Sequence, residues 1–286
     1  MIDVYWWSKV KSEKSDKENF GDLLVPFLLS KLTSLRFRWS RPHKKKYFKI
    51  FKKKHYLMIG SIIRFANSHS IVWGSGIIDS NDNVAKATFL GVRGPHTRKR
   101  LLNLGYNVPE RYGDPALLLA LFFKQNKNQI KYKYGIIPHY VDYDEVCKDY
   151  ANVPNVKVID VLTNTPETVI DEILKCEFTL SSSLHGIIVS HALGIPSLWL
   201  KVSDRLTGDD IKFYDYFDSL HLNIGKHITY KQYNVDELDE IFRANETESM
   251  PLKKNLSKVL LDLIKSFPFK KSKQFKRAIK TYFSNE

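Results

Sequence analysis

The chain has 286 residues, enough to bury one large core or two modest ones, and its 17 Phe, 15 Tyr and 5 Trp residues exclude a disordered polymer. Its formal net charge of +14 favours anionic partners: nucleic acid, acidic lipid, or phosphorylated and carboxylated small molecules. Cys147 and Cys176 are too few for a secreted disulfide scaffold and lack metal-site spacing. We expect a cytoplasmic protein, because the N-terminus does not read as a signal peptide and no apolar run approaches the roughly 18 residues of a transmembrane helix.

Short apolar runs alternate with helix-like stretches along the whole chain. The pattern predicts strands over residues 4–7, 56–59, 71–73, 87–92, 134–137, 156–159, 178–180 and 196–200. It predicts helices over residues 22–32, 96–104, 166–175, 185–193 and 235–242. Such alternation is typical of a parallel sheet covered on both faces. The predicted fold class is therefore α/β, with two Rossmann-like doubly wound lobes facing a cleft.

The polar stretch 124–129 has no apolar periodicity and predicts a hinge between the two lobes. We expect one Rossmann-like lobe over residues 1–125, a second over 126–240, and helices with a basic tail over 241–286. In open parallel sheets, ligands bind beyond the carboxyl ends of the strands. Polar residues that directly follow a strand are therefore the candidates for a site.

Two motifs of the first lobe have this placement. The sequence Asn19-Phe20-Gly21-Asp22 precedes an apolar helix, so that Asn19 and Asp22 either form a helix cap or face a ligand. The loop Trp73-Gly74-Ser75-Gly76 follows a strand, and its glycines let backbone N–H groups approach an anion. We therefore expect Gly74, Ser75 and Gly76 to contact an anionic ligand, although many tight turns have this composition.

Arg93 ends another strand, in the sequence Val92-Arg93-Gly94-Pro95. Its planar guanidinium suits two-pronged binding of a carboxylate or phosphate, whereas the alternative is a surface arginine on a loop. Asp114, between Gly113 and Pro115, is expected mainly to start a helix.

The strongest local motif lies in the second lobe, where a strand ends in three serines and a histidine opens a helix. Helix N-terminal amides and serine hydroxyls together make an anion site, and a histidine there can exchange protons near neutral pH. We therefore expect ligand contacts from Ser182, Ser183, Leu184, His185 and Gly186. His191 is expected to point into the core.

Other polar groups are expected at the same edge of the second lobe. His139 ends a strand, with Asp142 and Asp144 nearby, but no metal-site spacing joins the three, so we expect no metal. Basic side chains follow the next strand at Lys201, Arg205 and Lys212. One of them could neutralise a phosphate, or all three could form a solvated rim.

In this order, the motifs resemble those of the polysaccharide pyruvyl transferase family, over about residues 19–217. The resemblance rests on Asn19-Phe20-Gly21-Asp22, Trp73-Gly74-Ser75-Gly76, Arg93-Gly94-Pro95, Gly113-Asp114-Pro115, Ile137-Pro138-His139, Ser183-Leu184-His185-Gly186 and Gly194-Ile195-Pro196. It implies a fold like the GT-B glycosyltransferases, with the donor site in the second lobe. It also implies transfer of the carboxyethylidene group of phosphoenolpyruvate onto two hydroxyls of a sugar, with galactose as the expected acceptor.

The resemblance implies no cofactor and no metal, and it implies a role for particular residues. Arg93 would hold the donor anion, His185 would be the acid/base or a donor-site residue, and Arg205 or Lys212 would supply a further basic group. Because ketal formation requires protonation of the donor's methylene carbon, we expect His185 to be the general acid. Many members have arginine where this chain has Ser183. That departure implies either that Arg205 or Lys212 substitutes or that donor affinity is lower.

Two basic segments with interleaved aromatic residues flank this region, over residues 36–54 and 266–283. Their composition suits an anionic membrane surface, nucleic acid, or a plain solvated face; we favour lipid and expect no nucleic-acid partner. An undecaprenyl-diphosphate-linked glycan is accordingly the expected acceptor, in capsule or exopolysaccharide synthesis. The competing hypotheses are a nucleotide-sugar glycosyltransferase on the same fold and a basic nucleic-acid-binding protein.

Overall fold

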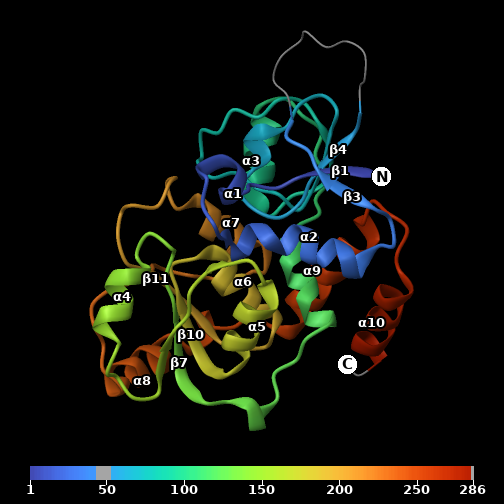
Figure 1. The fold of residues 1–286 in the computed structure, drawn as a ribbon. Coiled ribbons are helices and arrows are strands. Elements are labelled where there is room, and N and C mark those ends of the chain that lie inside the picture. Colours follow the sequence, from blue (N-terminus) through green and yellow to red (C-terminus); the bar gives the residue numbers. More distant parts are fainter. Residues whose placement is uncertain (43–52, 285–286) are drawn as a thin grey trace.

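Two five-stranded parallel sheets form the frame of the protein in a computed structural model that describes residues 1–42 and 53–284 (Figure 1). The first sheet has the order β3 (Phe37–Trp39), β1 (Ile2–Tyr5), β4 (His55–Leu57), β5 (Ser70–Trp73), β6 (Thr88–Gly91). The second has the order β12 (Ile228–Thr229), β11 (Ser197–Lys201), β10 (Cys176–Ser181), β7 (Tyr132–Ile137), β8 (Val156–Val158). The predicted α/β class with two Rossmann-like lobes is confirmed.

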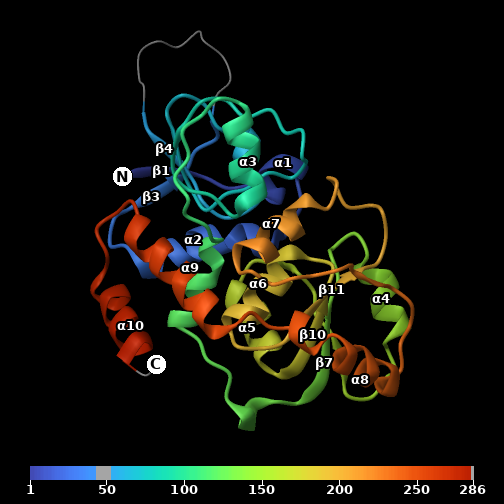
Figure 2. The ribbon, with the colours of Figure 1, turned by 180° about the vertical axis from the view of Figure 1, so that it is seen from behind.

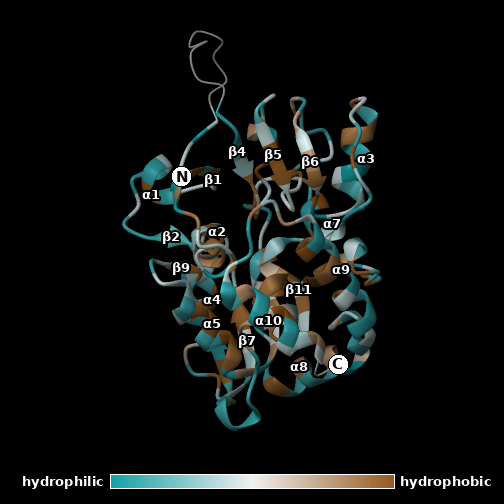
Figure 3. Cartoon of the chain, turned by 90° about the vertical axis from the view of Figure 1, so that its right-hand side faces the viewer, coloured by the Kyte–Doolittle hydropathy of each residue, from teal (hydrophilic) through white to brown (hydrophobic). Residues whose placement is uncertain are grey.

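All eight predicted strands coincide with strands of these sheets, because each carries enough buried apolar side chains to be recognised from the sequence. β5, β6 and β11 have apolar interior residues, brown in Figure 3, and polar or neutral residues at their ends; the apolar interior is expected of strands covered on both faces. Short strands escaped prediction. They include β3, β12 and the antiparallel pair of β2 (Glu18–Asn19) with β9 (Leu162–Thr163).

The five predicted helices are present as well. They are α2 (Phe20–Leu32), α3 (Pro95–Asn103), α5 (Pro166–Leu174), α6 (Leu184–Ala192) and α8 (Val235–Ala244). Further helices are α1 (Lys9–Glu13), α4 (Tyr143–Asp149), α7 (Ile211–Ser219), α9 (Lys253–Ser266) and α10 (Lys273–Ser284). None of the helices within residues 1–42 and 53–284 is long and apolar enough to cross a membrane.

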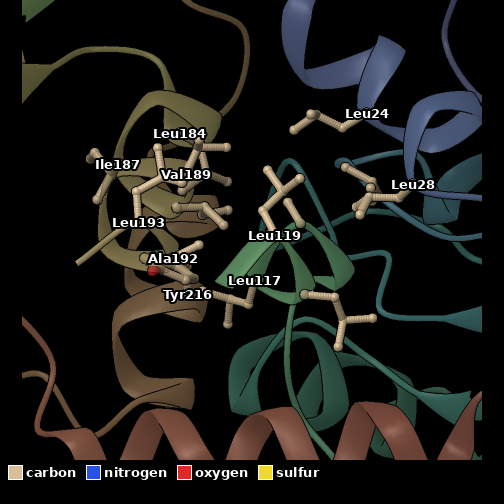
Figure 4. Packing of buried hydrophobic residues seen from close by; sticks show 14 of the residues in the cluster. Leu24, Leu28, Leu117, Leu119, Leu184, Ile187, Val189, Ala192, Leu193 and Tyr216 are labelled. Carbon is tan, nitrogen blue, oxygen red and sulfur yellow. The ribbon is translucent and has the colours of Figure 1, made fainter. Parts of the chain in front are cut away.

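One continuous apolar core joins the two lobes. Leu24 and Leu28 of α2 face the 3₁₀ segment η2 (Pro115–Leu121), whose Leu117 and Leu119 lie between them and α6 (Figure 4). α2 therefore begins beside the first sheet but packs on helices of the second lobe. Burial of this shared apolar surface fixes the relative position of the lobes.

The connection between the lobes runs from η2 to β7 and contains the predicted hinge, within which η3 spans Lys127–Gln129. Beyond the second sheet, α9 and α10 return to η2 and α2 (Figure 2). The domain limits at residues 125 and 240 stay a prediction.

Candidate functional site

In each sheet the strand order reverses at one point, and both reversal points open on the same cleft. In the second sheet the chain leaves β7 toward β8 and later returns to β10 on the other side of β7. In the first sheet β1 lies between β3 and β4 in the same way. Strand-order reversals leave a crevice beyond the carboxyl ends of the strands. Residues that follow β1 and β4 (Trp7, Gly60) and residues that follow β7 and β10 (His139, Ser183) all line the cleft.

The cleft has a volume of about 320 Å³. Its first-lobe wall includes Trp7, Lys9, Asn19, Asp22, Gly60, Ser61, Ile62, Arg64 and Phe65. Its second-lobe wall includes His139, Tyr140, Ser183, Leu184, His185, Arg205 and Lys212. The volume is at the lower end of the range for small-molecule sites.

The N-termini of α2 and α6 meet at the floor of this cleft. Gly21, in the first turn of α2, is so close to His185 in the first turn of α6 that a Cβ at position 21 would lie 2.1 Å from His185 Nδ1. Asn19 caps α2 by accepting a hydrogen bond from the Gly21 amide, whereas the Ser183 side chain makes no capping bond to α6. Two helix dipoles therefore present their positive ends to one space, which favours an anion.

His185 also faces a buried carboxylate. Its Nε2 lies 3.6 Å from Oδ2 of Asp114, whose side chain is fully buried. Oδ1 of Asp114 accepts a hydrogen bond from the Ala116 amide, whereas Oδ2 and His185 Nε2 have no hydrogen-bond partner among the described residues. A carboxylate beside one imidazole nitrogen orients the ring and stabilises its protonated form. Histidine–carboxylate pairs at this distance commonly tighten when a substrate binds.

The three basic residues that follow β11 differ in their partners. Lys201 forms ion pairs with Asp204 and Asp210, and Arg205 forms ion pairs with Asp142 and Glu145. Within the part of the chain that the structure describes, Lys212 has no carboxylate within ion-pair distance. Burial, together with nearby Arg93, lowers the pKa of Lys212 to about 8.

Two further cleft residues have shifted pKa values. Desolvation by the surrounding protein, with Glu18 and Glu13 nearby, raises the pKa of the Asp22 carboxyl well above its ordinary value. Burial, with Lys212 and Lys9 nearby, lowers the pKa of His139 to about 4, so that this imidazole is neutral at pH 7. The cleft therefore contains two ionisable side chains whose pKa values the protein shifts toward the neutral form.

Arg93 lies behind the wall of the cleft and is fully buried. Its Nε donates to Asp215 at 2.9 Å, and its two terminal nitrogens donate to the Ser61 hydroxyl at 2.7 Å and the Ile77 carbonyl at 2.6 Å. It does not line the cleft, but Ser61 does. The Arg93 guanidinium therefore acts on the cleft indirectly, by fixing the position of the Ser61 hydroxyl.

The loop Gly74–Ser75–Gly76 packs around Arg93 and does not line the cleft. A Cβ at Gly76 would lie 2.4 Å from the Arg93 guanidinium carbon, and the buried Ser75 hydroxyl donates to the Gly60 carbonyl. Gly74 has a φ of +92°, which favours glycine. In this structure the loop supports Arg93 in place of the expected direct contact with an anion.

The structure brings together most of the residues that the sequence predicted for the site. Asn19, Asp22, His139, Ser183, Leu184, His185, Arg205 and Lys212 line one cleft. Ser182 and Gly186 lie just behind it. The Ser182 hydroxyl accepts a hydrogen bond from the His139 amide, and Gly186 packs on Ser181. His191 is buried, as expected, and contacts the Tyr216 hydroxyl and the Ser249 carbonyl.

Gly60 and Ser61, which follow the strand 56–59 as the sequence suggested for an anion loop, line the cleft. The sequence did not point to Trp7, Arg64, Phe65, Tyr140 or Asp215. Trp7 follows β1 directly, so the strand-end rule could have found it; Asp215 lies in mid-helix and carries no such signal. Among the residues that the structure describes, no group of three His, Cys, Asp or Glu side chains could hold a metal ion.

Comparison with known proteins assigns the chain to a family. The sequence model of the polysaccharide pyruvyl transferase family matches residues 19–205, which is more than half of the chain. The chain belongs to the polysaccharide pyruvyl transferase family. The matched region includes the N-termini of α2 and α6, together with Asp114 and Arg205. Lys212 and Asp215 lie after the matched region.

A relative from Acanthamoeba polyphaga mimivirus, named "Uncharacterized protein L143", is 37% identical over 169 residues. That alignment covers 57% of this chain and 58% of the relative, so this chain spans less than two thirds of that protein's length. No solved structure matches the chain.

Proposed function

We propose that this chain transfers the carboxyethylidene group of phosphoenolpyruvate to a sugar, forming a pyruvate ketal and releasing phosphate. The proposal rests on family membership and on one observation in particular: Lys212, which has no ion-pair partner among the described residues, and two helix N-termini share a cleft with His185, which pairs with the buried Asp114. The first three features suit a small donor with carboxylate and phosphate groups. The pair suits proton transfer to carbon.

The donor is held, in this proposal, between Lys212, the first turn of α6 and the Ser61 hydroxyl. Lys212 neutralises one anionic group of the donor. Lys212 thereby takes the role of the arginine that many family members have at the position of Ser183. Arg93 is then a positioning residue, because it holds Ser61 and does not itself face the donor.

His185 acts as general acid, oriented by Asp114. A sugar hydroxyl oxygen bonds to C2 of phosphoenolpyruvate while His185 delivers a proton to C3, which becomes the methyl group. The C2–O bond to phosphate then breaks, and the second hydroxyl oxygen bonds to C2 and closes the ketal ring. The proton of the first hydroxyl returns to His185 and restores its protonated form, and the proton of the second hydroxyl leaves with the phosphate. The cationic groups that held the donor stabilise the departing phosphate.

The acceptor sugar lies against the aromatic part of the cleft. Trp7 and Phe65 stack with ring centroids 6.0 Å apart on the first-lobe wall, and Tyr140 lines the second-lobe wall. Aromatic rings offer apolar faces to a sugar at small entropic cost. We propose galactose in a lipid-linked precursor of a capsule or exopolysaccharide as the acceptor, with undecaprenyl diphosphate as the lipid and the cytoplasm as the site of reaction.

Titration calorimetry with phosphoenolpyruvate and with nucleoside diphosphates tests the donor. The proposal predicts binding of phosphoenolpyruvate that Lys212→Ala weakens at least about tenfold, as expected for one charge-assisted contact. Tight binding of a nucleoside diphosphate and none of phosphoenolpyruvate would instead indicate a glycosyltransferase.

A further inference from the structure

The C-terminal segment from Lys265 to Ser284 is basic throughout. It contains seven Lys or Arg residues and no Asp or Glu. α10 occupies most of this segment and lies at the edge of the molecule opposite α4, in both Figure 1 and Figure 2. It belongs to the part of the chain that the catalytic proposal leaves without a role.

One side of α10 anchors the helix to the protein. Phe275 is fully buried, with its ring centroid 5.5 Å from that of Phe267 and 6.4 Å from that of Phe122. Just before the helix, Ser272 donates a backbone hydrogen bond to Leu32 and a side-chain bond to Lys31, at the end of α2. The helix is therefore held in place by its apolar side.

The other side of α10 is exposed and positively charged. Lys273, Lys276, Arg277 and Lys280 are all exposed, and their spacing of three and four residues puts them on one face of the helix. Within residues 1–42 and 53–284, none of the four forms an ion pair. Because no carboxylate of the described residues neutralises this face, its charge is available to a partner.

A loop with an exposed apolar residue lies beside this face. Thr33 pairs with Lys271 in an isolated bridge, and its hydroxyl donates to the Lys270 carbonyl at 2.9 Å. Two residues further on, Leu35 is 46% exposed, and Arg36 next to it is exposed as well. Exposed Leu35 and Arg36 thus belong to a loop that is bonded to the segment leading into α10.

We propose that these residues, which we call the α10 basic face (Leu35, Arg36, Lys270, Lys273, Lys276, Arg277 and Lys280), dock the protein on an anionic phospholipid membrane. The basic side chains complement the negative surface potential of such a membrane. Leu35 gains by entering the apolar boundary of the lipid, whereas a nucleic-acid backbone offers it no such environment. Docking would hold the enzyme beside the lipid-linked acceptor, and only this consequence rests on the proposed function.

Sedimentation of the full chain with vesicles tests the proposal without any substrate. The vesicles contain phosphatidylcholine alone or phosphatidylcholine with phosphatidylglycerol. The test variant is K273E/K276E/R277E/K280E, and the matched control K127E/K131E/K148E/K226E changes the net charge equally at exposed positions of the second lobe. Circular dichroism verifies that both variants are folded, and a fluorescent oligonucleotide measures nucleic-acid binding in parallel.

Each basic residue near an anionic surface contributes about fivefold in affinity, so the α10 variant should bind phosphatidylglycerol vesicles at least about 100-fold more weakly. The control should retain most of the binding, Leu35→Ser should weaken it several-fold, and phosphatidylcholine vesicles should not bind. Equal losses in test and control variants would overturn the proposal in favour of a net-charge effect. Loss of oligonucleotide binding with unchanged vesicle binding would assign the face to nucleic acid. The vesicle assay contains no substrate, so its result does not depend on whether the protein catalyses pyruvyl transfer. Failure of the docking proposal and failure of the proposed function are therefore distinguishable.

Discussion

Arg93 and Asp215 form an ion pair that is completely removed from solvent, with Nε and Oδ2 2.9 Å apart. Arg93 follows the strand β6 of the first sheet, and Asp215 lies in α7, beyond the second sheet. Thr97 donates two further hydrogen bonds to the Asp215 carboxylate, from its amide at 2.8 Å and from its hydroxyl at 2.7 Å. The pair therefore links the lobes directly behind the cleft and fixes Ser61 at the same time.

Asp215→Ala should destabilise the protein by about 3–5 kcal/mol, because it leaves the Arg93 guanidinium buried without its counter-charge. Chemical denaturation measures this change. Asp218→Ala on the same helix is the control: its pairing with His96 at 2.6 Å is solvent-exposed and should contribute no more than about 1 kcal/mol. If the two substitutions lowered the free energy of unfolding by similar amounts, burial of the Arg93–Asp215 pair would not be important for stability.

Gly21→Ala should lower kcat about 100-fold, because the new methyl group would occupy the position of the His185 imidazole and displace it by about 1 Å. Phosphoenolpyruvate binding should persist, since Lys212 is untouched. Gly225→Ala is a matched control, as a Cβ at that glycine meets nothing within 4 Å. Unchanged kcat in Gly21→Ala would place His185 outside the reaction.

The dependence of kcat/KM for phosphoenolpyruvate on pH should reveal Lys212. Its pKa of about 8 means that the side chain is cationic below pH 8 and loses its charge above it. Donor capture should therefore fall about tenfold per pH unit on the alkaline side. Lys212→Arg should move this decline to higher pH, because arginine stays protonated. If kcat/KM declined at the same pH in Lys212→Arg as in the wild type, the titrating group would be a residue other than Lys212.

Trp7→Ala should raise KM for the sugar acceptor about tenfold and leave KM for phosphoenolpyruvate unchanged, because the ring lines the aromatic part of the cleft. Trp7→Phe keeps an apolar face and should recover most of the acceptor affinity. Steady-state kinetics with each substrate varied in turn separates the two effects. An equal rise in both KM values would instead point to a general disturbance of the wall.

The sequence predicted the two sheets well, since each main strand buries apolar residues over most of its length and is followed by a turn. It also predicted that His139, Ser183 and His185 lie close together, because residues at strand ends of parallel sheets converge on one edge, and the three line one cleft. Their roles in the site stay a prediction. Strands as short as β2 and β12 leave too few residues for a pattern.

Contacts between distant segments were beyond prediction. Arg93 carries the same strand-end signal as a ligand contact, yet Asp215, 122 residues later, holds it in the interior. Gly74 to Gly76 likewise resemble an anion loop but serve to pack that arginine. Which charge faces the cleft depends on partners such as Asp142 for Arg205, and local sequence does not encode that pairing.

Release of phosphate from phosphoenolpyruvate, measured with and without galactoside acceptors, tests the central claim most directly. The wild-type chain should release phosphate only when an acceptor is present. His185→Ala should lose about 10²- to 10⁴-fold of that rate while still binding phosphoenolpyruvate, as expected when a general acid is removed. Acceptor-dependent release at the wild-type rate in His185→Ala, or no release with any galactoside, would contradict the account.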